Sequence, residues 1–447
     1  MSMTVDVEQL RIGMFVHLDL GWWAHPFALS SFLITTPEQI ETIRGLGLKS
    51  LRWSPDKSRL PVEPQADADT GVDGEPSTAA LAAEPEAAPQ VALVDALAAG
   101  AAVSPLAPMA ARAGDLLSDQ QEAQRLCVAQ YNEAGSAWNE AQRLVPRQPE
   151  KAREITQALT KSLLDKMMVD REMCVRVLSE VGGDRVSGHA LNVTVISLLM
   201  GRVFGFGAQE MQDLGMGSLL HDVGKLDLPE HIRHLESRLT GAEQVAYREH
   251  VALGIAQGQR MGLSEGAMVV LAQHHEMADG SGFPKGLNLD RMEIGARIVA
   301  LVNRYDNLCN PPQASQALTP HEALSLLFAQ SRNKFDSTML NAFIRMMGVY
   351  PPGSLVQLTD DRYASVVSVN SSRPLKPRVL VCDTSIPVEN ALLLNLDGHA
   401  DLGIRRSLKP TQLPAAARDY LSPRQRVVYF FEPVPPVVAE SAEALAA

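Results

Sequence analysis

The stretch Met211-Gln-Asp-Leu-Gly-Met-Gly-Ser-Leu-Leu-His-Asp-Val-Gly-Lys225 is an apolar helical run that ends in an adjacent histidine and aspartate. His221 offers a neutral nitrogen ligand and Asp222 a carboxylate that can bridge two ions, so the pair predicts metal chemistry. Gly224 is predicted to adopt the left-handed turn that ends a helix. Lys225 then places a positive charge beside the metal, where a phosphate group can be held.

Further histidines lie near predicted helix ends in the same part of the chain: His189, His250, His274 and His275. Adjacent residues are about 100° apart on a helix, so His274 and His275 do not chelate one ion comfortably but can serve two. A dinuclear site bridged by Asp222 is therefore the economical arrangement. Imidazole and carboxylate ligands without thiolate favour Fe or Mn over Zn or Mg. Two such ions, with Asp222 and Lys225 as the catalytic pair, indicate a metal-dependent phosphohydrolase.

The composition is that of a globular chain of 447 residues, which predicts two or three folded units. The net charge of −12 is concentrated between Leu60 and Arg112, where eight acids and no Lys or Arg leave about −4 for the remainder, and we predict no nucleic acid polymer as a partner. The four cysteines form no Cys-x-x-Cys pair and so suggest neither a disulfide framework nor a zinc-thiolate site, which fits a reducing cytoplasm. The N-terminus lacks the apolar core of a signal peptide, and the Ala-rich stretch 91–113 is broken by prolines, so we predict no membrane span.

The first 60 residues are predicted to form a small α+β module. Short strands are expected at 5–7 and 14–18, and a helix over 37–46 with Thr36 as its N-cap. An aromatic knot lies between them: Trp22, Trp23, His25, Pro26 and Phe27. The knot is either the core of the module or a surface for a ligand or partner.

The remainder of the chain divides by composition and periodicity. Residues 61–116 are an acidic, Pro/Ala-rich segment that is predicted to be a disordered linker. Helical periodicity returns over 117–181, either as a homodimer-forming hairpin or as helices that pack onto the next domain. We expect an all-α domain at 182–350, a small β-rich subdomain at 351–435 and a frayed tail at 436–447. The predicted fold class is therefore mainly α, with a small module at each end.

The ordered motifs resemble one known family. They are His189, His221-Asp222-Val-Gly-Lys225, His250, His274-His275-Glu276 with Asp279-Gly-Ser-Gly-Phe-Pro284, and Arg297-Ile-Val-Ala. This pattern, over roughly 155–350, resembles the HD-GYP domain, a branch of the HD phosphohydrolase superfamily. The N-terminal Gln9-Leu-Arg-Ile-Gly-Met-Phe-Val segment with Trp23-Ala-His-Pro-Phe27 is similar to a small module often found ahead of such domains in bacteria.

The resemblance implies a bacterial signalling enzyme that hydrolyses cyclic di-GMP to pGpG or to GMP with Fe or Mn ions. It implies metal binding by His189, His221, Asp222, His250, His274 and His275. It also implies that the loop Gly282-Phe283-Pro284 contacts the substrate or a partner, such as a diguanylate cyclase with a GGDEF domain. The chain departs from the family pattern at four places. Asn303 stands where the last metal ligand is an Asp, Arg185 stands where three-metal variants have an acid, Phe283 replaces the signature Tyr, and residues 311–316 lack the usual basic cluster.

These departures leave three functions open. The first is an active cyclic di-GMP phosphodiesterase that tolerates Asn303. The second is a degenerate member that senses cyclic di-GMP or docks onto a diguanylate cyclase without turnover. The third is a hydrolase of another nucleotide, which the missing basic cluster favours because a dianionic ligand loses its charge partners there. We prefer the first, because all six ligands of the resemblance and Lys225 are present.

Overall fold

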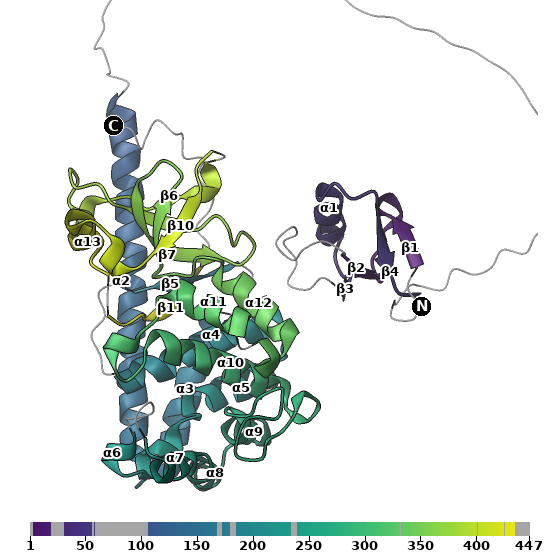
Figure 1. Cartoon of the computed structure of the whole chain (residues 1–447), viewed down its shortest axis with the longest axis vertical. Helices are drawn as coiled ribbons and strands as arrows, with labels where there is room; N and C mark the ends of the chain where they lie inside the picture. Colours follow the sequence, from purple (N-terminus) through teal and green to yellow (C-terminus); the bar gives the residue numbers. More distant parts are fainter. Residues whose placement is uncertain are drawn as a thin grey trace, which may run out of the picture. The chain divides into compact units, whose positions relative to one another are not determined.

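The computed structural model describes residues 3–18, 31–55, 58, 106–167, 172–178, 185–233, 239–330, 332–399, 401–423 and 425–433. These residues fall into two compact units, the first before residue 112 and the second after it (Figure 1). Helices dominate the second unit, and each end of the chain contributes a small sheet, so the predicted fold class is confirmed. The aromatic knot at 22–27, the linker residues 61–105 and the tail at 436–447 lie outside the described residues.

The first unit is a four-stranded antiparallel sheet with one helix. Its strands run in the order β1-β4-β2-β3: β1 (Met3–Asp6), β2 (Phe15–His17), β3 (Ser31–Leu33) and β4 (Ser50–Trp53). Helix α1 (Pro37–Gly45) begins after Thr36, which occupies the predicted N-cap position and whose backbone N–H donates to Gln39 Oε1 at 3.2 Å. Val16, Ile34 and Ile43 are fully buried between the helix and the sheet and form the core of the unit.

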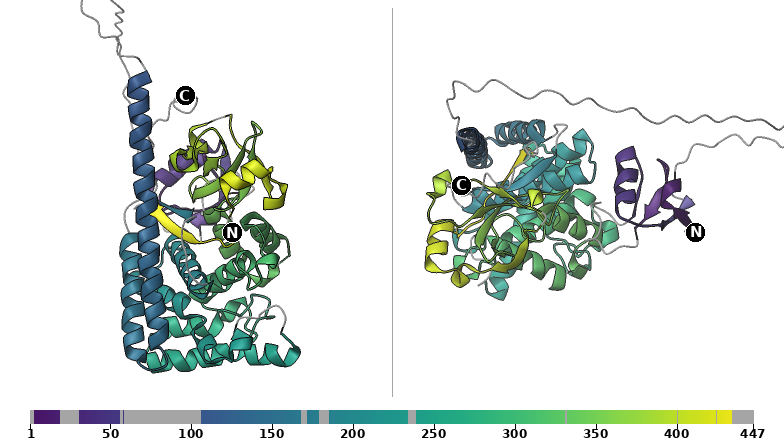
Figure 2. Two further views of the ribbon diagram at one scale, coloured as in Figure 1. Left: turned by 90° about the vertical axis from the view of Figure 1, so that its left-hand side faces the viewer. Right: turned by 90° about the horizontal axis from the view of Figure 1, so that it is seen from above.

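A long helical hairpin leads into the second unit, which includes it from Arg112 onward. Helix α2 (Leu106–Leu144) starts directly after Pro105, inside the stretch predicted to be linker, so the expected linker end at residue 116 is wrong. A proline just before a helix is compatible with its start, and reading the prolines only as breakers caused the error. Helix α3 (Pro149–Met167) turns back, and the two lie side by side along one side of the unit (Figure 2). Trp138 and Leu163 are buried in the core that they share with the helices that follow.

The helices that follow α3 build the body of the second unit. They are α4 (Arg185–Val203), α5 (Ala208–Leu220), α6 (Glu230–Arg233), α7 (Gly241–Arg248), α8 (His250–Met261), α9 (Glu265–Gln273), α10 (Ile294–Cys309), α11 (Pro320–Gln330) and α12 (Ser337–Met347). The 3₁₀ turn η4 (Val223–Asp227) joins α5 to α6. Helix α4 has the length and apolar composition of a membrane span, but 78% of that window is buried inside the unit. It is accordingly packed as the central core helix.

An antiparallel sheet lies at the end of the second unit that is opposite α7 and α8 (Figure 1). Its strands are β5 (Met173–Val177), β6 (Leu355–Leu358), β7 (Tyr363–Asn370), β8 (Arg378–Val381), β9 (Leu394–Asn395), β10 (Ile404–Leu408) and β11 (Tyr429–Pro433). The order is β10-β6-β7-β5-β11, with β8 paired to β7 and β9 to β8. Helix α13 (Ala415–Leu421) packs beside it. Strand β10 and helix α13 were not anticipated from the sequence.

Strand β5 corrects the prediction that residues 117–181 are helical throughout. It pairs with β7 on one side and with β11 on the other, although these strands lie far away in the sequence. Its residues Met173 to Arg176 are all buried, so the segment shows no alternation of buried and exposed positions that would mark it as a strand. The partner strands, and not the local pattern, make it a strand.

Strand β11 belongs to the core of the helical body and not to a separate C-terminal subdomain. Tyr429, Phe430 and Phe431 lie in the same buried cluster as α4 and α10. The Tyr429 hydroxyl is 2.9 Å from the Tyr305 hydroxyl, and the Tyr429 backbone N–H donates to Asn192 Oδ1 at 2.8 Å. The last strand of the chain therefore supports the helices that carry the candidate site.

Candidate metal centre

Five histidines and one aspartate from separate elements converge at one point of the second unit. His189 lies in the first turns of α4, His221 caps the end of α5, Asp222 precedes η4, His250 begins α8, and His274 caps the end of α9 with His275 beside it. They form two groups in which the ligand atoms lie within 4.8 Å of one another. One group is His189, His221 and Asp222; the other is Asp222, His250, His274 and His275. The geometry thus brings together all six residues that the sequence singled out.

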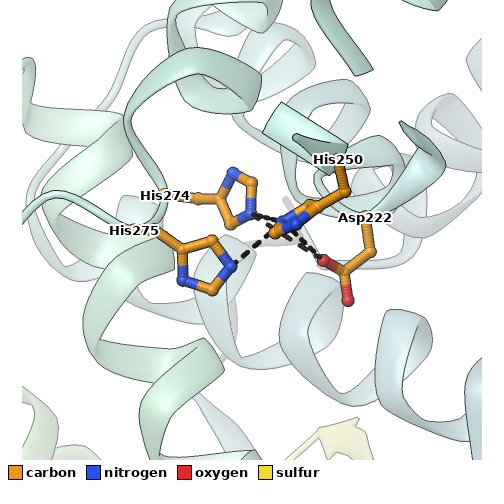
Figure 3. Close-up of side chains that lie close together, drawn as sticks. All are labelled: Asp222, His250, His274 and His275. Atoms are coloured by element: carbon orange, nitrogen blue, oxygen red, sulfur yellow. Dashed lines mark hydrogen bonds and ion pairs between the residues drawn. The ribbon is translucent and has the colours of Figure 1, made fainter. Parts of the chain in front are cut away.

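Asp222 is the member common to both groups, and its two oxygens face different histidines. Oδ2 lies 3.6 Å from His189 Nε2 and 3.4 Å from His221 Nε2. Oδ1 lies 3.7 Å from His250 Nε2 and 3.8 Å from His274 Nε2 (Figure 3). A carboxylate placed in this way has one oxygen for each of two ions.

The imidazole rings are oriented by hydrogen bonds on their outer nitrogens. Nδ1 of His221 donates to Ser218 O at 2.7 Å, Nδ1 of His250 to Tyr247 O at 2.6 Å, and Nδ1 of His274 to Leu271 O at 2.9 Å. A carbonyl oxygen only accepts, so Nδ1 carries the proton and Nε2 of each neutral ring presents its lone pair to the centre. These tautomers are the ones that a metal ligand requires.

Asp306 performs the same task for His189. Its Oδ2 lies 2.6 Å from His189 Nδ1, and its Oδ1 accepts hydrogen bonds from the side-chain amides of Asn192 and Asn310. Asn310 Nδ2 and Asn192 Nδ2 also reach Val427 O, next to β11. The fully buried Asp306 therefore positions His189.

The arrangement fits divalent cations. The Nε2 atoms of His250 and His274 are 3.3 Å apart, as are those of His221 and His189. Bare lone pairs that face each other across such distances repel unless a cation lies between them. Asp222 Oδ1, in addition, is buried without a hydrogen-bond partner among the described residues. The donor set, its tautomers and this orphaned oxygen all meet the requirements of a metal centre.

The charge state of the centre at neutral pH also suits metal binding. Burial lowers the pKa of His250 to about 4 and holds the pKa values of His274 and His275 well below 6.5. For Asp222, burial alone acts to raise the pKa, but Lys225 and His221 outweigh it and hold the pKa of the carboxyl well below 3.8. His250, His274 and His275 are therefore neutral and Asp222 is ionised over the whole physiological range.

These shifts predict a pH-dependent stability of the metal-free protein. Below pH 6.5 the unfolded chain protonates His250, His274 and His275, whereas the folded chain keeps them neutral. The unfolded state then binds more protons, so the free energy of unfolding should fall as the pH decreases from about 6.5 towards 4. The expected slope is about 1 kcal/mol per pH unit for each histidine involved. Urea unfolding with a chelator at pH 7, 6 and 5 measures it.

A variant sharpens this measurement. His274→Gln removes one of the three histidines that resist protonation, so the slope below pH 6.5 should become shallower by about one third. A free energy of unfolding that is equal at pH 7 and pH 5 in the unsubstituted chain would contradict the prediction.

Lys225 lies beside Asp222 at the centre. Its Nζ is 2.8 Å from Asp222 Oδ2 and 4.9 Å from the centre of the Tyr247 ring. The Tyr247 ring in turn lies 4.8 Å from the His250 ring, and its carbonyl accepts the His250 Nδ1 proton. Tyr247 therefore holds in place both the Lys225 ammonium and the His250 ring. No sequence motif predicted this role.

The loop Gly282-Phe283-Pro284 folds back against the centre. The Phe283 ring stacks on His275 with centroids 4.4 Å apart and rings inclined by 21°. The fully buried Glu276 holds the loop, because its carboxylate accepts the backbone N–H groups of Lys285 and Leu287 at 2.7 and 2.8 Å. A Cβ on Gly282 would lie 2.4 Å from Met277 N, so glycine is needed there for close packing. One aromatic residue of this loop is thus in direct contact with a histidine of the cluster.

Asn303 is buried on α10, one turn before Asp306. Its Oδ1 accepts a hydrogen bond from Asn307 Nδ2 at 2.7 Å. The described hydrogen bonds do not connect Asn303 with the histidine cluster. The group of His189, His221 and Asp222 accordingly has three protein ligands, whereas the other group has four.

Arg297, which the sequence motif included, has a structural role. Its Nε donates to Met292 O at 2.8 Å, and its Nη1 lies 3.1 Å from Asp336 Oδ2. Asp336 is also the N-cap of α12. The arginine therefore ties the start of α10 to the start of α12.

Comparison with known proteins places a family boundary after α3, at residue 172, and not between the two units at residue 112. Residues 2–172 match the family model described as a domain of unknown function (DUF3391), and residues 172–339 match the model of the HD domain. The cyclic di-GMP phosphodiesterase PA4108 of Pseudomonas aeruginosa is 26% identical over 384 residues, covering 84% of both chains.

Two further relatives match shorter stretches of the chain. The cyclic di-GMP phosphodiesterase response regulator RpfG of Xanthomonas campestris is 28% identical over 203 residues, which is 44% of this chain and 53% of that protein. The 3'3'-cGAMP-specific phosphodiesterase 2 of Vibrio cholerae is 27% identical over 167 residues, 37% of this chain and 32% of that protein. The chain thus spans about half or less of the length of these two relatives, whereas it covers 84% of PA4108.

Proposed function

Because residues 172–339 form an HD domain, a phosphohydrolase fold, preceded by a module of the DUF3391 family, we propose that the chain hydrolyses cyclic di-GMP to pGpG or GMP at a dinuclear metal centre. The observation that carries this proposal is Asp222, whose two oxygens face two separate sets of histidines. Relatives named as cyclic di-GMP phosphodiesterases support the choice of substrate.

The proposed ligands divide between two ions. His189, His221 and Asp222 Oδ2 would hold one, and Asp222 Oδ1 with His250, His274 and His275 would hold the other. A shell of imidazoles and one carboxylate favours Fe or Mn over Zn or Mg. When bound, two divalent ions would activate water and withdraw charge from the scissile phosphate.

The chain's own residues would bind and orient the phosphate. Lys225 is now paired with Asp222 at 2.8 Å. Once Asp222 shares its charge with bound cations, the ammonium can donate to a phosphate oxygen while the Tyr247 ring keeps it in place. Lys225 and Asp222 are therefore the proposed catalytic residues.

Turnover by the purified chain tests the proposal. The protein is loaded with Mn²⁺, or with Fe²⁺ without oxygen, its metal content is measured, and cyclic di-GMP, pGpG and GMP are separated by chromatography. Parallel reactions with 3'3'-cGAMP distinguish the substrate preferences that relatives show. The double variant His221→Ala, Asp222→Ala serves as the inactive control. If protein with two ions bound hydrolyses cyclic di-GMP no faster than this variant, the proposal is wrong.

A second candidate function is binding without turnover. Asn303 favours it, because a neutral amide already bonded to Asn307 adds no charge to the three-ligand group. In that case the chain would sense cyclic di-GMP or dock onto a diguanylate cyclase through the loop at 282–284. Nucleotide binding in the absence of any hydrolysis would support this function.

Replacement of Asn303 measures how far this residue limits the centre. Asn303→Asp should raise the metal content towards two ions and increase the rate of hydrolysis about tenfold, because a carboxylate completes the weaker group. Metal analysis at limiting Mn²⁺ and the rate are measured together. Asn307→Asp is a control on the neighbouring turn of the same helix, and it should give no such gain. A variant with unchanged metal content would show that residue 303 lies outside the centre.

A further inference from the structure

Arg248 lies at the edge of the candidate centre, although no motif of the sequence pointed to it. It is the last residue of α7, two positions before His250. Its guanidinium carbon lies 4.9 Å from the centre of the Phe283 ring, which is itself stacked on His275 at 4.4 Å. A single aromatic ring therefore separates this cation from an imidazole of the cluster.

The position of Arg248 is fixed by its neighbours. Tyr247 accepts the Nδ1 proton of His250 through its carbonyl oxygen and packs its ring beside the same imidazole. The backbone that carries Arg248 is thus tied to a proposed metal ligand on one side, and its side chain to the loop of Phe283 on the other. This places the guanidinium without using its hydrogen-bond donors.

The charge of Arg248 is also still available. Lys225 faces Asp222 and Arg297 faces Asp336, whereas Arg248 is exposed and forms no ion pair with the carboxylates of the described residues. A contact with an aromatic ring holds a guanidinium weakly when water is present. Two parallel N–H···O bonds to a phosphate are much stronger. A phosphate bound next to the loop 282–284 would therefore form hydrogen bonds with the Arg248 guanidinium.

A cyclic dinucleotide presents such a phosphate. It carries two phosphodiester groups, of which one reacts at the centre beside Lys225 and the other needs a separate cation. Residues 311–316 contain no Lys or Arg to provide it. Building on the proposed function, we propose that Arg248 binds the second, non-reacting phosphate of the cyclic dinucleotide, with Phe283 holding the guanidinium in position. Arg248 is thus a residue for substrate recognition and not for the chemical step.

Steady-state kinetics of Arg248→Ala and Arg248→Lys test this assignment. Loss of a charge-assisted contact should raise the KM for cyclic di-GMP about 10- to 100-fold, while kcat changes less than about threefold. Arg248→Lys keeps the positive charge but loses the planar guanidinium, so its KM should lie between those of the unsubstituted chain and Arg248→Ala. Arg418→Ala, which removes an exposed arginine from α13, controls for the change in net charge and should not alter KM. The metal content and the unfolding temperature of Arg248→Ala should match those of the unsubstituted chain.

A substrate with one phosphodiester separates this role from a general loss of activity. Bis(p-nitrophenyl) phosphate has no second phosphate, so the rise in its KM caused by Arg248→Ala should be at least fivefold smaller than the rise for cyclic di-GMP. Equal losses for both substrates, or an unchanged KM for cyclic di-GMP, would overturn the assignment.

The assignment can also be judged if the chain does not hydrolyse cyclic di-GMP. Binding of cyclic di-GMP to the Mn²⁺-loaded chain is then measured by calorimetry, and Arg248→Ala should weaken it by the same 10- to 100-fold. In that outcome the proposed function fails while the role of Arg248 stands. An equal affinity of the variant and the unsubstituted chain would refute the role independently of turnover.

Discussion

Asp222→Asn is expected to release both metal ions and to lower the rate of cyclic di-GMP hydrolysis by a factor on the order of 1000 or more. Asp222 is the only residue that belongs to both ligand groups among the described residues. Asparagine keeps its size, but it offers one neutral oxygen and replaces the other with an N–H donor group. Neither group would then have an anionic ligand, so neither would hold a divalent cation firmly.

The measurement combines metal analysis, activity and stability. Metal content per chain should fall from two ions towards zero. The unfolding temperature without metal should also decrease, because a carboxyl whose pKa is held well below 3.8 stabilises the folded state at neutral pH. His275→Gln is the matched control, since His275 belongs to one group only and its loss should remove one ion. Retention of two ions by Asp222→Asn would show that this carboxylate does not bridge them.

Gly224→Ala should have the largest effect of any single methyl group added to the centre. A Cβ at this position would lie 2.0 Å from His250 O and 2.3 Å from Gly254 N, which are backbone atoms of α8. No side-chain rotation relieves such contacts, so α8 must move away from η4 and carry His250 with it. We expect a loss of at least about 3 kcal/mol of stability, together with weaker metal binding by the His250 group.

Denaturant unfolding and metal titration check this expectation. Gly241→Ala is the matched control, because nothing lies within 4 Å of a Cβ at that position, near the start of α7. The control should change stability by less than about 0.5 kcal/mol. If Gly224→Ala behaves like Gly241→Ala, then α8 and η4 are not packed as closely as the structure shows.

The prediction that position 224 requires glycine was correct, but the reason given for it was wrong. The sequence suggested that it adopts a left-handed conformation at a helix end, but it is not among the glycines with positive φ. It is glycine because the backbone of α8 approaches it. Close approach between η4 and α8, which are separated in sequence by the helices α6 and α7, leaves no local signal, so the sequence could not distinguish the two explanations.

The local chemistry of the centre could be predicted from the sequence. Residue type alone shows that His221, Asp222 and the other histidines are able to bind metal. The order of the motifs along the chain predicted that these residues belong to one site. Helix periodicity and the cap at Thr36 likewise gave the fold class and the bounds of α1 within a residue. Strand β5 was missed because its sequence does not distinguish a strand from a helix turn, and only its pairing with β7 and β11 makes it a strand.

Only the tertiary structure decided how the residues pair. It assigned each oxygen of Asp222 to its own histidines, placed Asp306 behind His189 across 117 residues of chain, and set Arg248 over Phe283. Ligand chemistry is a property of single side chains and can be seen in a sequence. Pairing depends on how helices pack in three dimensions, which brings together groups that no local pattern connects.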